Sequence, residues 1–396
     1  MASPRGAAGG TGEAAFLAHG MGKTLVEPDW PPLSGEEVSA VLARYGLPGA
    51  TAVLLWRSPR PMSAAALVRY GGGEVFVKRH HAGVRSAAQL AAEHAFAAHL
   101  RALGVAVPAV LRLADGTTTV ASGDYRYEVH ERAEGIDLYR DALSWSPFTS
   151  AAHALAAGTA LARFHLASTS FGRPERPPGV LTNSCAVIAA ADPLAVVARL
   201  AARRPGLASY LDGRRWRDDL TRYHLSAIRE LAPLLPALGR LWGHGDWHPS
   251  NLTWTTPAPD ADVAAVIDLG LANRTFAVHD LAVAIERSAV AWLDLAGTGH
   301  ADVDIPAVDA LLDGYASVRP LTQAELSALA ALLPVVHVEY ALSEVEYFAS
   351  VVRSRQNADL AYDGYLIGHA CWFGTPEGRA LLSHLRQRAD RRPAAP

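Results

Sequence analysis

The segment 244–251, which reads HGDWHPSN, and a short run that follows it carry the side chains best suited to chemistry. Asp246 lies in a His-Gly-Asp turn, five residues before Asn251. Asp268 ends the apolar run 263–267 and is followed by a Leu-Gly pair. A carboxylate that leaves a buried strand beside a glycine, where the backbone can turn, is a good ligand for a hard cation such as Mg²⁺.

Phosphoryl transfer needs a group that orients the attacking hydroxyl, oxygen atoms that hold magnesium, and a lysine that neutralises phosphate oxygens. Asp246 suits the first task, and Asn251 and Asp268 suit the second. Any one of these residues alone would be explained as a turn former or a helix cap. Two such motifs in the right order, separated by an insert of hairpin length, are much rarer by chance, so the pattern favours phosphoryl transfer.

A lysine for the phosphates stands at the end of the apolar run Val75-Phe76-Val77-Lys78. Glu93 follows fifteen residues later, on the inner side of the next expected helix, where it is placed to form the ion pair that fixes Lys78. Arg79 is the competing residue, but alternation along a strand places Lys78 and Phe76 on the same face. We therefore assign Lys78 to the phosphates and Glu93 as its partner.

The first third of the chain predicts an antiparallel sheet, because short apolar and β-branched runs alternate with Pro and Gly clusters. Capping boxes that begin at Ser34 and Ser86 predict helices over 34–45 and 86–103. The expected strands cover residues 52–56, 65–70, 74–79, 110–113 and 125–131.

After Gly135 the chain becomes rich in Ala and Leu with helical periodicity. The expected helices cover residues 151–166, 194–202, 216–231, 308–318 and 323–348. The pattern predicts an α+β chain in four parts. These are a flexible arm over 1–30, a β-rich lobe with one main helix over 31–134, a mainly helical lobe over 135–388, and a flexible tail over 389–396.

The loop and the two motifs after it, IDLG and then HDLA, resemble the aminoglycoside phosphotransferase and choline-kinase-like branch of the protein-kinase fold. The resemblance covers roughly residues 40 to 385. The family's H-G-D-x-x-x-x-N pattern is met by His244, Gly245, Asp246 and Asn251, and its D-x-G motif begins at Asp268. The resemblance implies a bilobal fold, with a small β-rich N-lobe that binds the nucleotide and a larger helical C-lobe that holds the acceptor.

The resemblance also implies roles. Asp246 would be the catalytic base or hydroxyl-orienting group, and Asn251 and Asp268 would hold the Mg²⁺ that bridges the phosphates of ATP or GTP. The hinge after the fifth strand is occupied by residues 131–135, where the main chain of Glu131 and Ala133 would meet the base; the choice between ATP and GTP stays open.

The nucleotide-covering loop departs from protein kinases, because no G-x-G-x-x-G occurs between Tyr45 and Lys78. This leaves the residue that covers the phosphates unassigned. The run 20–24, GMGKT, is a false match to a phosphate-binding loop, because the required earlier glycine is Leu17 and no apolar strand precedes it.

Three further residues receive structural rather than chemical interpretations. Asp280, in HDLA, resembles the family's helix-borne Asp that supports the catalytic loop. His165 is expected to be a packed core histidine, and His248 a partner of the loop.

The acceptor pocket is expected in the helical lobe, where acidic and aromatic residues gather after residue 280. The candidate acidic residues are Glu286, Asp294, Glu339, Glu344 and Glu346. By helical spacing Glu339, Ser343 and Glu346 share one face, which suits an amine-bearing acceptor such as an aminoglycoside, another antibiotic or an amino alcohol. A solvated helix face explains the same spacing equally well.

Composition excludes several classes of function. The 396 residues carry a net charge of −3 without a block of Lys or Arg, which argues against nucleic acid and membrane partners. Only Cys185 and Cys371 are present, far apart, so neither disulfides nor a zinc site are expected, and a reducing cytoplasm fits best. No secretory leader or long apolar span is evident.

The sequence therefore predicts a phosphotransferase that moves the γ-phosphate of ATP or GTP to a small-molecule hydroxyl. Antibiotic resistance and a metabolic role, as a homoserine or amino-alcohol kinase, are both open. A stress-related Ser/Thr protein kinase and a nucleotide-binding pseudokinase are the remaining alternatives, and the sequence leaves the oligomeric state open.

Overall fold

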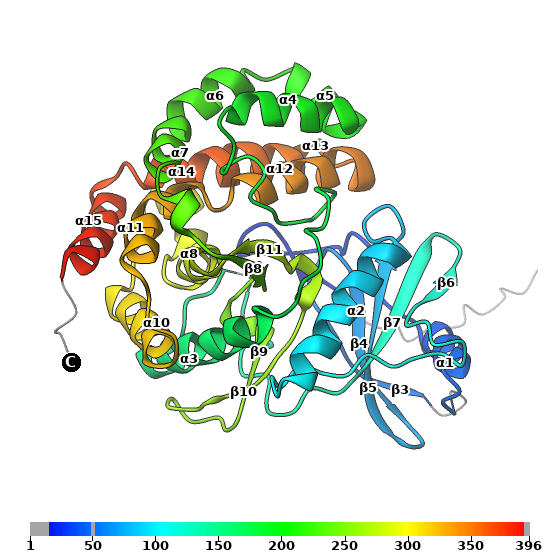
Figure 1. The fold of residues 1–396 in the computed structure, drawn as a ribbon. Helices are drawn as coiled ribbons and strands as arrows, with labels where there is room; N and C mark the ends of the chain where they lie inside the picture. Colours follow the sequence, from blue (N-terminus) through cyan, green and yellow to red (C-terminus); the bar gives the residue numbers. More distant parts are fainter. Residues whose placement is uncertain (1–15, 49–51, 144, 392–396) are drawn as a thin grey trace, which may run out of the picture.

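The computed structural model describes residues 16–48, 52–143 and 145–391, which form two lobes (Figure 1). The N-lobe is built on one antiparallel sheet with the strand order β3-β4-β5-β7-β6. Its strands are β3 (Val53–Arg57), β4 (Ala64–Tyr70), β5 (Gly73–His81), β6 (Val120–Ser122) and β7 (Tyr125–Glu131). The lobe also contains helices α1 (Gly35–Arg44) and α2 (Ala87–Ala102), each with the capping box expected from its leading serine.

The strand alternation separates the two faces of this sheet. Val75 and Val77 join a small core that includes buried residues of α1, such as Val38 and Leu42. The alternate residue Lys78 points to the other face and lines a cavity between the lobes. Lys78 and Phe76 thus share a face, as alternation predicts, whereas Arg79 lies on the opposite face and pairs with Glu37 of α1.

The C-lobe is mainly helical (Figure 1). Its helices are α3 (Ala151–Ser168), α4 (Pro193–Arg203), α5 (Pro205–Asp212), α6 (Trp216–Tyr223), α7 (Leu225–Leu231), α8 (Ala277–Ser288), α9 (Trp292–Thr298), α10 (Ile305–Val318), α11 (Gln323–Leu332), α12 (Val338–Glu346), α13 (Arg355–Asp359), α14 (Ala370–Trp372) and α15 (Pro376–Asp390), with π-helical turns at Tyr347–Val352 and Leu360–His369. Two short antiparallel pairs carry the chemistry-bearing loops: β8 (Arg240–Gly243) with β11 (Asn273–Phe276), and β9 (Leu252–Trp254) with β10 (Val263–Val266).

Two sequence expectations are wrong in detail. Residues 110–113 form only an isolated bridge, from Val110 to His130. The edge strand beside β7 is instead β6, and the chain turns from β6 into β7 at Gly123, which has a φ of +53°. The expected helix 323–348 is interrupted after α11 by a 3₁₀ turn at Leu333–Val335, because Pro334 lacks the N–H that an α-helix needs.

The expected N-terminal arm differs from the structure in its described part. Residues 18–19 and 25–26 pair as the two-stranded hairpin β1 (Ala18–His19) and β2 (Leu25–Val26), and His19 is buried. Lys23 of this hairpin pairs with Asp294 of the C-lobe, and Trp30 donates to the Tyr347 hydroxyl. Residues 1–15, and the tail after 391, lie outside the described residues.

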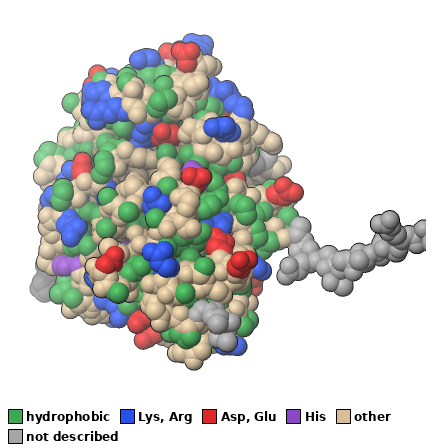
Figure 2. Space-filling view, turned by 90° about the vertical axis from the view of Figure 1, so that its right-hand side faces the viewer, with side chains coloured by type: hydrophobic (Ala, Val, Ile, Leu, Met, Phe, Trp, Pro, Cys, Tyr) green, Lys and Arg blue, Asp and Glu red, His purple; other side chains and the backbone are tan. Residues whose placement is uncertain are grey.

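The most apolar helical stretch of the C-lobe lies inside the protein. The stretch Gln323–Val352 is long and apolar enough to cross a membrane, but 89% of its most apolar window is buried inside the protein, as in a core helix. On the face shown in Figure 2, acidic and basic side chains are interspersed rather than gathered into a field of one sign.

Helices α3 and α10 cross at unusually close range through two glycines, which yields a stability prediction. A Cβ on Gly158 would lie 2.0 Å from the carbonyl oxygen of Leu311, and one on Gly314 would lie 2.0 Å from that of Leu155. We expect Gly158→Ala to lower the free energy of unfolding by roughly 2–3 kcal/mol, because the helices must separate. Urea unfolding measures this change.

The matched control is Gly364→Ala, where a Cβ would meet nothing within 4 Å. That change should stay within about 1 kcal/mol of the wild type, on the stabilising side, because alanine is the better helix former. Equal stabilities for the two variants would show that the α3–α10 crossing is not tight.

Candidate active site

A buried carboxylate holds the loop that follows β8. Asp280, on the first turn of α8, accepts hydrogen bonds from the backbone N–H groups of His244 at 2.6 Å and Gly245 at 2.9 Å. It also lies 2.9 Å from Nε2 of His165 on α3. Asp280 and His165 are fully buried, which agrees with the supporting roles expected for both. Burial opposes ionisation, but His165 and the neighbouring histidines outweigh it and lower the pKa of Asp280.

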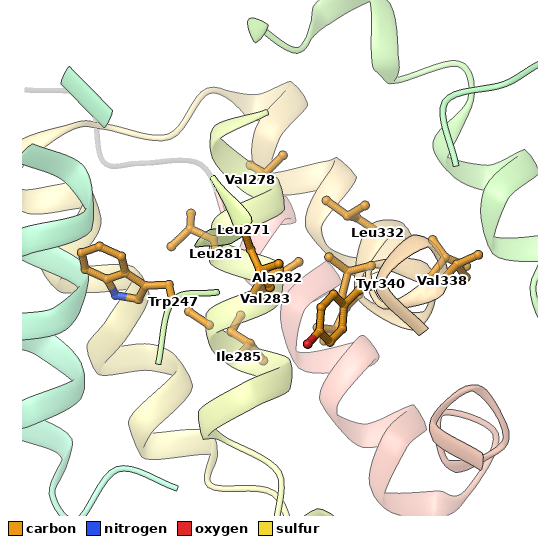
Figure 3. Packing of buried hydrophobic residues seen from close by; sticks show 14 of the residues in the cluster. Trp247, Leu271, Val278, Leu281, Ala282, Val283, Ile285, Leu332, Val338 and Tyr340 are labelled. Carbon is orange, nitrogen blue, oxygen red and sulfur yellow. The ribbon is translucent and has the colours of Figure 1, made fainter. Parts of the chain in front are cut away.

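The loop backbone has no room for side chains at its turn. Gly245 has a φ of +78°, and a Cβ there would lie 2.4 Å from the carbonyl oxygen of Leu271. Trp247 of the loop is fully buried, and Figure 3 shows it and Leu271 packed beside Leu281 of α8. The loop is therefore fixed from both sides, by hydrogen bonds at its start and by apolar contacts after the turn.

The carboxylate of Asp246, on this loop, lies beside two basic side chains. Its carboxylate lies 3.5 Å from Nε of Arg287 and 3.6 Å from Nε2 of His248. Burial works against ionisation, but Arg287 and His248 outweigh it and hold the pKa of Asp246 below its usual range. The group is thus ionised at neutral pH, and its Oδ1 atom, 3.5 Å from Nε of Arg287, accepts no hydrogen bond from the described residues. An ionised carboxylate of this kind is suited to accept a hydrogen bond from a substrate hydroxyl.

Asn251 and Asp268 stand on adjacent strand ends beside Asp246. The Asn251 amide nitrogen donates to the backbone oxygen of Asp246 at 2.9 Å, and to its carboxylate at 3.2 Å. The amide oxygen of Asn251 is therefore the atom left for a cation. Asp268 has a left-handed φ of +57°, unusual for a residue with a side chain, and its Oδ1 accepts from Gly270 N–H at 3.2 Å. An amide oxygen and a carboxylate are the donor types that Mg²⁺ prefers, so these residues fit the ion.

Lys78 joins the two lobes across this site. Its Nζ lies 3.0 Å from Oδ1 of Asp268, while its strand partner is Glu128 of β7. Burial lowers the pKa of Lys78, but Asp268, Glu128 and Glu93 together raise it above its ordinary value, so the ammonium stays charged. The same attraction, against the opposing effect of burial, lowers the pKa of Asp268.

The expected ion pair between Lys78 and Glu93 is not formed among the described residues. Glu93 lies in α2, is 5% exposed, and has a buried oxygen without a hydrogen-bond partner. Lys78 instead contacts Asp268 of the C-lobe across the cleft. Both Lys78 and Glu93 line the same cavity, so Glu93 contributes charge to the site without direct contact.

A cavity of about 350 Å³ lies between the lobes and collects most of the predicted residues. Its walls come from the N-lobe sheet, α2, the segment after β7, and the loops after β8 and β10. The predicted residues that line it are Lys78, Glu93, Glu131, Ala133, Asn251 and Asp268. The N–H of Glu131 donates to the Ala109 carbonyl at 2.8 Å, so Glu131 can offer a nucleotide base only its carbonyl.

Three histidines surround Glu128 at the back of this cavity. His94 Nε2 bonds one carboxylate oxygen, and His80 Nε2 lies 3.1 Å from the other. The potential ligand atoms of His94, Glu128 and His130 lie within 4.8 Å of one another. A divalent cation there would compete with the ammonium of Lys78 for the same carboxylate. The cluster is therefore best explained as the hydrogen-bonded surroundings of a buried, ionised Glu128, whose pKa is held well below normal.

Arg287, beside Asp246, lies between two aromatic rings. The guanidinium of Arg287 lies 3.8 Å from the ring centre of Trp145 and 5.1 Å from that of Tyr340. Two buried carboxyls lie close to it: burial raises the pKa of Glu286 to about 7 and that of Glu344 to about 8, against the opposing charge of Arg287. Glu344 has an oxygen without a hydrogen-bond partner.

The acidic wall expected from helical spacing does not form. Glu339 accepts from the backbone N–H groups of Val187 and Ile188, and Glu346 pairs with Arg204 at 3.1 Å. Asp294 is exposed and pairs with Lys23. Of the five acidic candidates, Glu286 and Glu344 are the two whose charges act on Asp246 and Arg287.

Four arginines of the candidate site were not predicted from the sequence. Arg287 lies two helical turns beyond Asp280, and Arg60 lies in the loop between β3 and β4 and lines the cavity. Arg85 and Arg176 both donate to the carbonyl of Gly270 and so brace the segment after Asp268. The seven-residue spacing from Asp280 signals that Arg287 shares its helix face, whereas the other three depend on contacts distant in sequence.

Known proteins share both the sequence pattern and the fold of this chain. A model of the phosphotransferase enzyme family matches residues 63–321. A homoserine kinase of Gluconacetobacter diazotrophicus is 32% identical over 199 residues, which are 48% of this chain and 50% of that protein. An uncharacterized protein of Deinococcus radiodurans is 30% identical over 292 residues, which are 72% of this chain and 74% of that protein.

Solved structures show the same fold. A microcompartment-associated aminopropanol kinase is similar with a TM-score of 0.57 and 19% identity, covering 91% of this chain and 99% of that one. An aminoglycoside phosphotransferase from Alicyclobacillus acidocaldarius is similar with a TM-score of 0.53 and 18% identity, covering 91% and 98%. The predicted bilobal, protein-kinase-like α+β fold is confirmed.

The support that Asp280 gives to the loop can be tested by stability. Asp280→Asn replaces one accepting oxygen with an amino group that faces buried N–H donors, so we expect a loss of roughly 3 kcal/mol at pH 7. The folded-state pKa of Asp280 is lowered, so its stabilisation is present above the unfolded pKa and is lost as pH falls through the folded one. The stability difference between wild type and variant should hold from pH 7 to about 5 and narrow below about pH 4. A difference that is small, or that grows on acidification, would contradict this role.

Proposed function

Because the chain belongs to the phosphotransferase enzyme family, we propose that it transfers the γ-phosphoryl group of ATP or GTP to a hydroxyl of a small molecule through Asp246. That the protein is a phosphotransferase follows from the family. The observation that carries the finer proposal is the ionised Asp246 carboxylate, which accepts a hydrogen bond from the amide of Asn251 on the same rigid loop. Asn251 in turn lines the cavity between the lobes together with Lys78 and Asp268.

The reaction exchanges one P–O bond for another. The acceptor oxygen bonds to the γ-phosphorus while the bond from that phosphorus to the β–γ bridging oxygen breaks, and the nucleoside diphosphate leaves. Asp246 holds the hydroxyl in line and receives its proton as the new bond forms. Its lowered pKa suits an orienting group that accepts the proton late, rather than a strong base that removes it beforehand.

The remaining residues bind and orient the nucleotide. Asn251 and Asp268 would hold Mg²⁺, which when bound neutralises the phosphate oxygens during transfer. Lys78 would exchange its contact with Asp268 for phosphate oxygens, and the carbonyl of Glu131 and the main chain of Ala133 would meet the base. The free thiols Cys185 and Cys371 are consistent with a cytoplasmic protein.

The acceptor is proposed to carry an amine. Glu286 and Glu344 are buried beside Arg287 and Asp246, and an ammonium group would satisfy the unpartnered oxygen of Glu344. An aminoglycoside or another amine-bearing antibiotic fits this chemistry. The second candidate is a metabolic acceptor such as an amino alcohol or homoserine, which is favoured by the likeness to a homoserine kinase and by Arg287, a cation able to meet a carboxylate.

Asp246→Asn tests the orienting carboxylate. We expect the phosphoryl-transfer kcat to fall about 10³-fold, with the Kd of Mg-ATP changed little, because Asp246 acts on the acceptor. Asp268→Ala should instead weaken Mg-ATP binding, because it removes a metal ligand. Radiolabelled transfer and calorimetric titration separate these effects. Asp260→Asn, in the exposed turn between β9 and β10, is the control; full activity in Asp246→Asn would refute the mechanism.

The amine proposal predicts a pH dependence. The pKa of Glu344 is raised to about 8, so the carboxyl is largely protonated at pH 7 and ionises as pH rises through 8. The affinity for an amine-bearing acceptor should therefore increase between about pH 6.5 and 8.5, roughly tenfold, until the amine itself deprotonates. Acceptor KM across a panel of amino alcohols, aminoglycosides and amine-free sugars measures this.

In Glu344→Gln the increase should vanish while the KM for Mg-ATP stays the same. Glu230→Gln, an exposed substitution at the far pair with Arg386, should behave as wild type. Equal use of amine-free acceptors by the wild type would rule out an amine-binding role for Glu344.

A further inference from the structure

The loop between β3 and β4 occupies the place of a nucleotide-covering loop but lacks its glycines. It reads Ser58-Pro59-Arg60-Pro61-Met62-Ser63, with a proline on each side of the arginine. Prolines fix φ, so this loop is stiffer than a glycine-rich one. Ser58, Arg60 and Ser63 line the same cavity as Lys78 and Asp268. The loop thus brings a cationic side chain to the space in which the phosphates would lie.

Arg60 stands among the carboxylates of the candidate active site. The charges of Asp137, Asp246 and Asp268 all act on its guanidinium, while burial lowers its pKa. Asp246 and Asp268 are the residues proposed to act on the acceptor hydroxyl and to hold the metal. A cation whose charge is felt by both carboxylates, and which lines the same cavity as Asp268, would lie close to the γ-phosphoryl group.

The N-terminal hairpin fixes this arginine. Nδ1 of His19, in β1, lies 3.0 Å from Nη1 of Arg60. A guanidinium has only donors, so His19 must accept this hydrogen bond through an unprotonated nitrogen. The backbone N–H of His19 also donates to the carbonyl of Pro59 at 2.8 Å. His19 is 5% exposed, so two hydrogen bonds from one buried residue hold the tip of the loop.

We propose that Arg60 is a catalytic residue that donates hydrogen bonds to the transferring γ-phosphoryl group, and that His19 is its positioning residue. This assignment rests on the proposed phosphotransfer. Arg60 adds no bond-making step: as the β–γ bridging P–O bond breaks and the acceptor P–O bond forms, its N–H groups neutralise charge on the phosphoryl oxygens. An arginine held in the same chain performs this task with a planar set of donors that Lys78 cannot supply.

The assignment explains two features that the rest of the site leaves without a role. The phosphate-covering function, unassigned in the absence of a glycine-rich loop, falls to Arg60. The hairpin at residues 18–26, outside the segment 63–321 that matches the family, becomes part of the active site through His19. An arginine with only a structural role would be needed for folding, but it would not distinguish a transition-state analogue from the ground state.

The test compares binding of Mg-ADP with binding of Mg-ADP plus aluminium fluoride, which resembles the transferring phosphoryl group and needs no identified acceptor. Calorimetric titration of the full chain should give the wild type at least about 10²-fold tighter binding of the aluminium fluoride complex. Arg60→Ala should lose at least about tenfold of that preference, with the Kd of Mg-ADP changed less than about threefold. Arg60→Lys should retain part of the preference, because it keeps the charge but not the planar donors.

His19→Ala should reduce the preference in the same direction, and His19→Asn should restore part of it, because an amide oxygen can still accept from Arg60. Arg69→Ala, on β4 at an exposed pair with Glu74, is the control and should leave the preference unchanged. Thermal unfolding of each variant checks that it is folded, and Arg60→Lys supplies the comparison should Arg60→Ala unfold.

An undiminished preference in folded Arg60→Ala overturns the assignment while leaving the proposed function standing. An equal loss of affinity for Mg-ADP and for the aluminium fluoride complex also overturns it, because Arg60 would then bind only the ground state. A wild type that binds Mg-ADP but shows no preference overturns the assignment in the same way. A wild type that binds no Mg-ADP contradicts the proposed function itself.

Discussion

The buried carboxylate of Asp280 is the constraint on which the rest of the site depends. Two backbone N–H groups at the start of the catalytic loop and the imidazole of His165 converge on it. A buried carboxylate without such donors would be costly, so β8, α3 and α8 must meet in one arrangement. Seven residues further along α8, on the same face, Arg287 lies beside Asp246. One helix therefore fixes both the backbone of the loop and the charge of its central residue.

The two lobes meet through apolar packing, in which Phe96 of α2 contacts Phe164 and Trp242, and through ionic and polar contacts. Lys78 reaches Asp268, Arg85 reaches the carbonyl of Gly270, and Trp30 reaches Tyr347. The first of these contacts joins two residues that would each bind part of a metal–nucleotide complex. A bound metal–nucleotide complex could therefore replace the direct ion pair between Lys78 and Asp268 by contacts of each residue with the complex. Nucleotide binding would then be coupled to the position of one lobe relative to the other.

Local patterns predicted much of this architecture. The capping boxes at Ser34 and Ser86 and the strand alternation at Lys78 are set by residues close in sequence, and each has the expected geometry. The predictions that failed depended on tertiary contacts. Pro334 divides the expected long apolar helix. Glu339 accepts a hydrogen bond from the backbone N–H of Val187, which is far away in sequence. Arg60 was missed because its neighbours come from four separate parts of the chain.

The central claim is that Asn251, Asp268 and Lys78 form the metal and phosphate site that presents a nucleotide to Asp246. A crystal structure with Mg²⁺ and a non-hydrolysable ATP analogue tests it most directly. We expect a cation about 2.1 Å from the amide oxygen of Asn251 and from a carboxylate oxygen of Asp268, with Nζ of Lys78 moved onto phosphate oxygens. A nucleotide bound outside this cavity, or a cation that contacts neither Asn251 nor Asp268, would contradict it.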